Sequence, residues 1–247
     1  MEKQLLIIII LLSQFLYSAT AEQLERYLSI SQAEEELLLL ESQFSQMQSN
    51  FSQDSNASEN KSYEMELLSI RFSDYIQSHL SETEMDEVLN NYKNVIFLQF
   101  VSARNDNTFD QNETDTYINT LKENPESESR IKLVKKISRE INNKDAMIQM
   151  FDELMKPLIE SAKGGDKVDK ATMKKRREAY MKRMVESSRK ETLFATREFS
   201  MEELDALLEV AKTPAINHET KAVFGATAYA LQEFFLSLAS RYDISKH

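Results

Sequence analysis

Apolar side chains recur at helical spacing along most of the chain. The clearest example is the segment LSETEMDEVLNNYK, and the segment FSMEELDALLEVAK repeats it in the same register. In both, four apolar residues follow the i, i+3, i+4, i+7 pattern that places them on one face of a helix. The two stripes are Met85, Val88, Leu89 and Tyr92, and Leu204, Leu207, Leu208 and Ala211.

Each of these two helices begins with a capping box. Ser81 can accept a hydrogen bond from the backbone N–H of Glu84, whose carboxylate can accept one from the Ser81 N–H. Ser200 and Glu203 are spaced in the same way, and the segment FDQNETDTYINTLK is a third and weaker copy. The boxes therefore predict helices that start at the residue after each cap.

The segments upstream of the boxes indicate an imperfect internal duplication. Residues 24–44 and 133–155 share an apolar turn, a polar break and a second amphipathic helix, and each is followed later by a capping-box helix. We therefore expect an all-α, multi-helix bundle built from two related halves, residues 22–125 and 126–247. The apolar C-terminal segment KAVFGATAYALQEFFLSLAS is expected to be a central helix with several neighbours, or half of a dimer contact.

The second half resembles an exported bacterial family, the domain of unknown function 2059. Phe199–Pro214 with Ala215 is similar to that family's F-[ST]-x-x-E-L motif, short helix and S-P-x-G turn, and RIKLVKKISREINNKDAMIQM is similar to its entry segment. The turn here lacks the glycine, and Ala211 stands where an aromatic residue is common. The resemblance covers about the last 118 residues. It implies an all-helical fold and export, and it supplies no catalytic residues.

Composition supports a helical chain and excludes several enzyme classes. Glycine and proline number only 3 each, which leaves little material for the many turns of an all-β fold. The glycines, Gly164, Gly165 and Gly225, cannot form a Walker loop, a Rossmann fingerprint or a G-x-S-x-G elbow. No cysteine is present, so disulfide bonds cannot stabilise the fold.

The first residues have the pattern of a signal peptide. Lys3 precedes the apolar stretch of residues 5–17, and Ala19-Thr20-Ala21 has the form of a cleavage site. This stretch is shorter than the roughly 20 apolar residues of a transmembrane helix, although an uncleaved anchor is the alternative. We expect residues 1–21 to be removed after Ala21 and the protein to reach the periplasm of a Gram-negative bacterium.

Charge is unevenly distributed along the chain. The whole protein carries a net charge of −11, whereas residues 163–190 hold 11 basic and 4 acidic side chains. We expect this segment to be either a binding surface for anionic lipid, glycan or an acidic protein, or a solvated helix that balances the acidic first half. No nucleic-acid partner is expected. The candidate surface residues are Lys174, Lys175, Arg176, Arg177, Lys182, Arg183, Arg189 and Lys190.

Residue patterns for catalysis or metal binding are scarce. The histidines, His79, His218 and His247, belong to no H-E-x-x-H or E-x-x-H motif, so we predict no metal site and no cofactor. His79 is expected to end a helix, and His218 to lie on an exposed turn. Glu233 is the one carboxylate embedded in apolar sequence, and a place on the helix surface is its expected location.

The acceptor-like sites for N-glycosylation are Asn56 and Asn112.

Taken together, the sequence patterns favour an exported, non-enzymatic binding or envelope-maintenance module without a predicted catalytic residue. The alternative is a hydrolase of an envelope polymer that uses carboxylates.

Overall fold

The protein folds as an all-α bundle. The structure, a computed structural model, describes residues 18–35, 37, 59–105, 111–161 and 168–241. Helices account for 87% of these residues and none of them belongs to a strand, which confirms the predicted fold class. An isolated antiparallel bridge joins Ser18 to Ser81.

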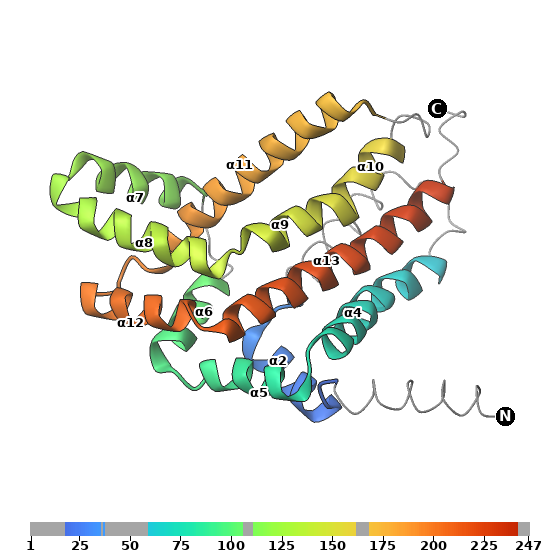
Figure 1. Cartoon of the computed structure of the whole chain (residues 1–247), viewed down its shortest axis with the longest axis horizontal. Helices are drawn as coiled ribbons and strands as arrows, with labels where there is room; N and C mark the ends of the chain where they lie inside the picture. Colours follow the sequence, from blue (N-terminus) through green and yellow to red (C-terminus); the bar gives the residue numbers. More distant parts are fainter. Residues whose placement is uncertain (1–17, 36, 38–58, 106–110, 162–167, 242–247) are drawn as a thin grey trace.

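The helices follow one another with short connections wherever the chain is described (Figure 1). A 3-10 turn, η1 (Pro125–Ser127), precedes α8, and a π-helical turn, η2 (Phe151–Met155), joins α9 to α10. In chain order the α-helices are α2 (Ala21–Ser31), α4 (Glu59–His79), α5 (Glu82–Asn91), α6 (Val95–Asn105), α7 (Gln111–Glu123), α8 (Glu128–Ile141), α9 (Lys144–Met150), α10 (Lys156–Ser161), α11 (Lys170–Ala195), α12 (Met201–Ala211) and α13 (Pro214–Arg241).

Helix α13 lies at the centre of the bundle. It packs against α4 along one side and against α9 and η2 along the other, and its first turns also contact α5 and α8 (Figure 1). The alanines on α13 are small enough to let these neighbours approach closely, and Ala222, Ala226 and Ala230 are all buried. The C-terminal apolar segment is therefore a central helix, as its composition predicts.

Gly225 allows the closest approach between α4 and α13. A Cβ atom at this position would lie 2.7 Å from both Cε1 and Cζ of Tyr75, which is closer than real Cβ atoms come to a neighbour. Tyr75 in turn stacks on His79, with ring centroids 3.6 Å apart, and His79 ends α4 as predicted. A larger residue at this position would therefore force the ring of Tyr75 to move.

Two of the three predicted capping boxes are present. The backbone N–H of Glu84 donates to Ser81 Oγ over 3.2 Å, and the Ser81 N–H donates to Glu84 Oε2 over 2.8 Å. Ser200 and Glu203 form the same pair of bonds at the start of α12. Both predicted apolar stripes are buried. Residue 110, the predicted third cap, lies outside the described residues.

A further capping box, which was not among the predicted ones, begins α2. Thr20 Oγ1 accepts from the Gln23 N–H over 3.2 Å, and the Thr20 N–H donates to Gln23 Oε1 over 2.9 Å. The preceding residue, Ala19, is 1% exposed and its N–H donates to the Leu80 carbonyl over 2.8 Å. Cleavage after Ala21 stays a prediction, and it would remove the cap and these contacts.

The two predicted halves share one hydrophobic core. Helices α4 and α5 of the first half pack on α13 of the second, and α6 packs against α11 and α12. The boundary at residues 125 and 126 falls in η1, between α7 and α8. The duplication itself stays a prediction.

Candidate functional site

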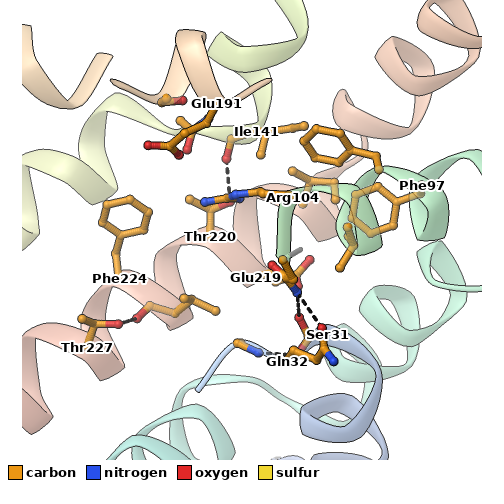
Figure 2. Close-up of a pocket in the computed structure, with 18 of the residues that line it drawn as sticks. Ser31, Gln32, Phe97, Arg104, Ile141, Glu191, Glu219, Thr220, Phe224 and Thr227 are labelled. Carbon is orange, nitrogen blue, oxygen red and sulfur yellow. Dashed lines mark hydrogen bonds between the residues drawn. The ribbon is translucent and has the colours of Figure 1, made fainter. Parts of the chain in front are cut away.

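A cavity of about 300 Å³, partly open to solvent, lies where α2, α6, α8, α9, α11 and α13 meet. Its size is at the lower end of the range typical of small-molecule pockets. Much of the lining is apolar and includes Phe97, Phe100, Met150, Met184, Ile216 and Phe224. Charged lining residues are Arg104 from α6, Glu191 from α11 and Glu219 from α13 (Figure 2).

Glu219 is held by two phenols. The Tyr27 hydroxyl donates to Glu219 Oε1 over 3.1 Å, and the Tyr92 hydroxyl donates to the same oxygen. Tyr27 lies on α2 and Tyr92 at the end of α5, so the carboxylate ties both helices to α13. None of the described residues donates a hydrogen bond to Oε2. One carboxylate oxygen is therefore fixed by the fold, while the other is left for a ligand or solvent.

Burial raises the pKa of the Glu219 carboxyl from 4.5 to about 7. Loss of solvent disfavours the charged form, and this effect outweighs the opposing effects of the two tyrosine hydrogen bonds and the positive charge of Arg104. Part of the surface of Glu219 remains exposed, because the residue lines the cavity. Glu219 is thus poised to exchange a proton near neutral pH.

The two phenols remain protonated over the same pH range. Burial, together with the nearby Glu219 carboxylate, raises the pKa of Tyr27 and Tyr92 well above the ordinary value of 10.0. The tyrosine rings also pack edge to face, with centroids 6.1 Å apart. Both hydroxyls therefore act as fixed donors, and the proton that moves near pH 7 belongs to Glu219.

Arg104 brings a positive charge into this cavity without a partner. In Figure 2 its side chain extends from the last turn of α6 into the cavity, between Glu219 and Glu191 in that view. Among the described residues, none forms a hydrogen bond or an ion pair with its guanidinium group, although its charge acts on Glu219. The guanidinium therefore keeps its donors available.

The backbone around the cavity is fixed by side chains that do not titrate. Asn105 Nδ2 donates to the Ser31 carbonyl over 2.9 Å, which joins the end of α6 to the end of α2. Thr220 Oγ1 donates to the Ile141 carbonyl over 2.8 Å, so the last turn of α8 is anchored to α13 beside Glu219. These bonds hold the lining helices in place around Arg104 and Glu219.

The predicted basic surface lies on α11 and its residues do not line the cavity. Six of its eight residues are exposed, whereas Arg189 and Lys190 are half-buried. Lys190 pairs with Asp115 over 2.8 Å and Arg177 with Asp152 over 3.7 Å. Lys174 lies 3.9 Å from Glu178 on the same helix. Two other residues of α11, Met184 and Glu191, line the cavity.

The other sequence-predicted positions have different outcomes. His218 was expected on an exposed turn, and this is wrong: it lies within α13, with Nδ1 3.5 Å from Glu84 Oε1 at the start of α5. The side chain of Glu233 and residue Asn56 lie outside the described part of the chain, while Asn112 is in α7. Among the described residues, no group of three His, Cys, Asp or Glu side chains could hold a metal ion.

Sequence reasoning missed Glu219 because its surroundings in the chain are polar. The segment INHETK has the composition of an exposed turn, and only the fold brings Tyr27 and Tyr92 to it. A usable signal was present in the apolar stripes. A tyrosine that ends a buried stripe, as Tyr92 does, needs a hydrogen-bond partner for its hydroxyl.

Comparisons of the chain with protein-family models, with curated proteins and with solved structures each return no match. The resemblance to the domain of unknown function 2059 therefore stays a prediction. Within the described ranges, no helix combines the length and apolarity needed to cross a bilayer.

Proposed function

We propose that this protein is a binding module whose cavity holds a small molecule with an apolar body and an acidic group. The observation that carries the proposal is the unpartnered guanidinium of Arg104 inside a cavity with a largely apolar lining. Arg104 is half-buried, so its guanidinium has lost part of its hydration without gaining a partner among the described residues, and a bound anion would offset that penalty. The aromatic and methionine side chains would then cover the apolar part of the ligand.

The chemistry of the lining favours an anion over a cation. The guanidinium presents a planar fork of donors that matches two oxygens of an acidic group. Glu219 does not neutralise it through an ion pair, and its pKa of about 7 leaves much of the carboxyl uncharged near neutral pH. A cationic group seated beside the guanidinium would be repelled by it, whereas an anionic group there would be attracted.

Calorimetric titration with three probes that each carry a ten-carbon chain tests the proposal: decanoate, decanol and decyltrimethylammonium. Decanoate should bind most tightly in a slightly acidic buffer. Arg104→Gln should weaken its binding by at least about tenfold, because a hydrogen-bonded charge is lost. Lys182→Gln removes one exposed cation of α11 and should leave the affinity unchanged. Equal affinity of the wild type and Arg104→Gln for decanoate, or a preference for the cationic probe, would contradict the proposal.

A carboxylate-dependent hydrolase is the second candidate. The raised pKa of Glu219 favours it, because a general acid or base works best when its pKa lies near the working pH. A cavity of about 300 Å³ suits a small substrate better than a polymer chain. Release of fragments from cell-wall material by the wild type, and its loss in Glu219→Gln, would establish the hydrolase instead.

The exposed basic face of α11 is proposed as a separate contact surface. None of its eight residues lines the cavity, so a partner could occupy this face while the cavity holds a ligand. The partner would be anionic lipid, glycan or an acidic protein, in keeping with the export that the first residues predict. The apolar side of α11 is occupied within the bundle, where Tyr180 packs against Phe151. Contact through this face would therefore be electrostatic, without insertion of the helix into a bilayer.

A further inference from the structure

We infer that the cavity selects a monoanionic carboxylate and takes up one proton as it binds, with Glu219 and the ligand sharing that proton. This inference rests on the proposed function, because it concerns the ligand of the same cavity. It adds the identity of the acidic group and a dependence of affinity on pH.

The hydrogen bonds of Glu219 show which oxygen can take part. Oε1 already accepts from the hydroxyls of Tyr27 and Tyr92, whereas Oε2 has no donor among the described residues. A proton on Oε1 would have to compete with two donors, so it resides on Oε2. In that form Oε2 donates a hydrogen bond, whereas in the ionised form it can act only as an acceptor. A ligand carboxylate therefore finds a donor at Oε2 only when Glu219 is protonated.

The charges that face Glu219 lead to the same requirement. Arg104 of α6 is the one cation in the described lining, and Glu191 of α11 is a second carboxylate. Tyr27 of α2 and Tyr92 at the end of α5 are neutral donors. Helices α8 and α9 contribute Ile141, Asn142 and Met150, none of which titrates.

The adjacent histidine on α13 does not line this cavity. His218 lies beside Glu84 of α5, with 3.5 Å between Nδ1 and Oε1. Arg104 therefore faces two carboxylates when Glu219 is ionised, and an anionic ligand would add a third negative charge. Protonation of Glu219 removes one of the three. The cavity can then accept a single negative charge, while a dianion would remain unfavourable.

Protons and charges balance in the proposed binding step. Free Glu219 is ionised above its pKa, and the ligand arrives as a carboxylate. One proton from solvent is taken up on Oε2, and it forms a hydrogen bond from Glu219 to one ligand oxygen, while the guanidinium of Arg104 donates to the ligand carboxylate. No bond is broken in either carboxyl group. A pKa of about 7 for Glu219 makes this uptake accessible near neutral pH.

Calorimetric titration of the full chain with decanoate tests the inference. Above about pH 7 the affinity should fall by up to tenfold per pH unit, since one proton is bound with each ligand. Titrations at about pH 8 in two buffers of different ionisation enthalpy should show uptake of nearly one proton. Decyl phosphate, a dianion at this pH, should bind more weakly than decanoate.

Glu219→Gln keeps a hydrogen-bond donor at this position without a titratable group. The variant should bind decanoate with little dependence on pH, and above about pH 8 it should bind more tightly than the wild type. The proton uptake of the wild type tests the inference without any variant, so a folding defect in Glu219→Gln would not remove the test. An affinity for decanoate that is constant with pH, no proton uptake, or tighter binding of the dianion would overturn it. If the wild type bound no decanoate at any pH, the proposed function would fail first.

Discussion

Two charged regions of the protein, the cavity and the outer face of α11, differ in what surrounds their charges. In the cavity, two carboxyls and one guanidinium lie among apolar and aromatic side chains, and burial raises the pKa of Glu219 to about 7. On α11, clustered cations such as Lys175 and Arg176 are exposed to solvent. Water screens exposed charges strongly, so their pairs contribute little to stability. The few charges in the cavity are therefore expected to interact with one another more strongly than the many on the surface.

Helix α11 belongs to both regions. Its inner face contributes Met184 and Glu191 to the cavity, while Lys182 and Arg183 on the other side face solvent. The run of basic residues dominates the sequence of this helix, whereas the residues of chemical interest are the few on the opposite side. The density of charged residues along the sequence is thus a poor guide to which charges lie near a cavity.

The largest effect is expected from Glu219→Gln on the pH dependence of stability. The folded-state pKa of about 7 exceeds the ordinary value of 4.5, so the folded protein binds this proton more tightly than the unfolded chain. The penalty for ionising Glu219 is absent below about pH 4.5, grows as the pH rises, and is complete above about pH 7. Between these limits the stability of the variant relative to the wild type should rise by roughly 3 kcal/mol.

Urea unfolding of both proteins at about pH 4 and pH 8 measures this difference. Gln retains an oxygen that can accept from Tyr27 and Tyr92, so the comparison isolates the charge. Glu153→Gln on η2, a carboxylate outside the cavity lining, is the matched control and should show a much smaller change. A constant difference between wild type and Glu219→Gln at the two pH values would mean that Glu219 has an ordinary pKa.

The next largest effect concerns the contact between α4 and α13. Gly225→Ala should destabilise the protein by about 1–3 kcal/mol, because the new methyl group overlaps the ring of Tyr75. In a Tyr75→Ala background the same change should stabilise by up to about 1 kcal/mol, since Ala favours helix over Gly. A double-mutant cycle with chemical denaturation measures the reversal of sign. The same sign in both backgrounds would show that the close approach is absent.

The helix caps provide a smaller effect. Ser81→Ala and Ser200→Ala should each destabilise by roughly 1 kcal/mol, because each removes an acceptor from a helix N-terminus. We expect the larger loss at Ser81, whose hydroxyl also donates to Glu84 over 2.7 Å in a partly buried setting. Ser102→Ala, at an exposed position within α6, is the control and should be nearly neutral. Unchanged denaturation midpoints for both cap variants would refute the assigned caps.

The smallest effect on stability is expected on α11. Changing Lys174, Lys175, Arg176 and Arg177 together to Gln removes two ion pairs, of 3.9 and 3.7 Å, on exposed side chains. The free energy of unfolding should therefore change by less than about 0.5 kcal/mol. The helical content measured by circular dichroism should stay the same, because Gln is nearly as good a helix former. If the basic face binds anionic liposomes or cell-wall material at low salt, the variant should no longer sediment with them. Equal sedimentation of the two proteins would reduce the basic face to a solvated helix surface.

Local patterns predicted the helices well, and long-range contacts limited prediction of the site. The boxes at Ser81 and Ser200 involve residues only three positions apart, so the sequence contains all the information needed. The hydrogen bonds to Glu219 join residues 192 and 127 positions apart, and the pKa depends on the burial that these contacts produce. The cap at Thr20 was missed for a different reason, because Ala19-Thr20-Ala21 also fits a cleavage site.

A crystal structure of the protein with ω-bromodecanoate bound is the most direct test of the central claim, since anomalous scattering from bromine locates the apolar end of the ligand. The account predicts a carboxylate within hydrogen-bonding distance of Arg104 and of Glu219 Oε2, with the bromine among apolar lining residues such as Met184 and Phe224. A ligand seated on the outer face of α11, or in the cavity with its carboxylate away from Arg104, would contradict it.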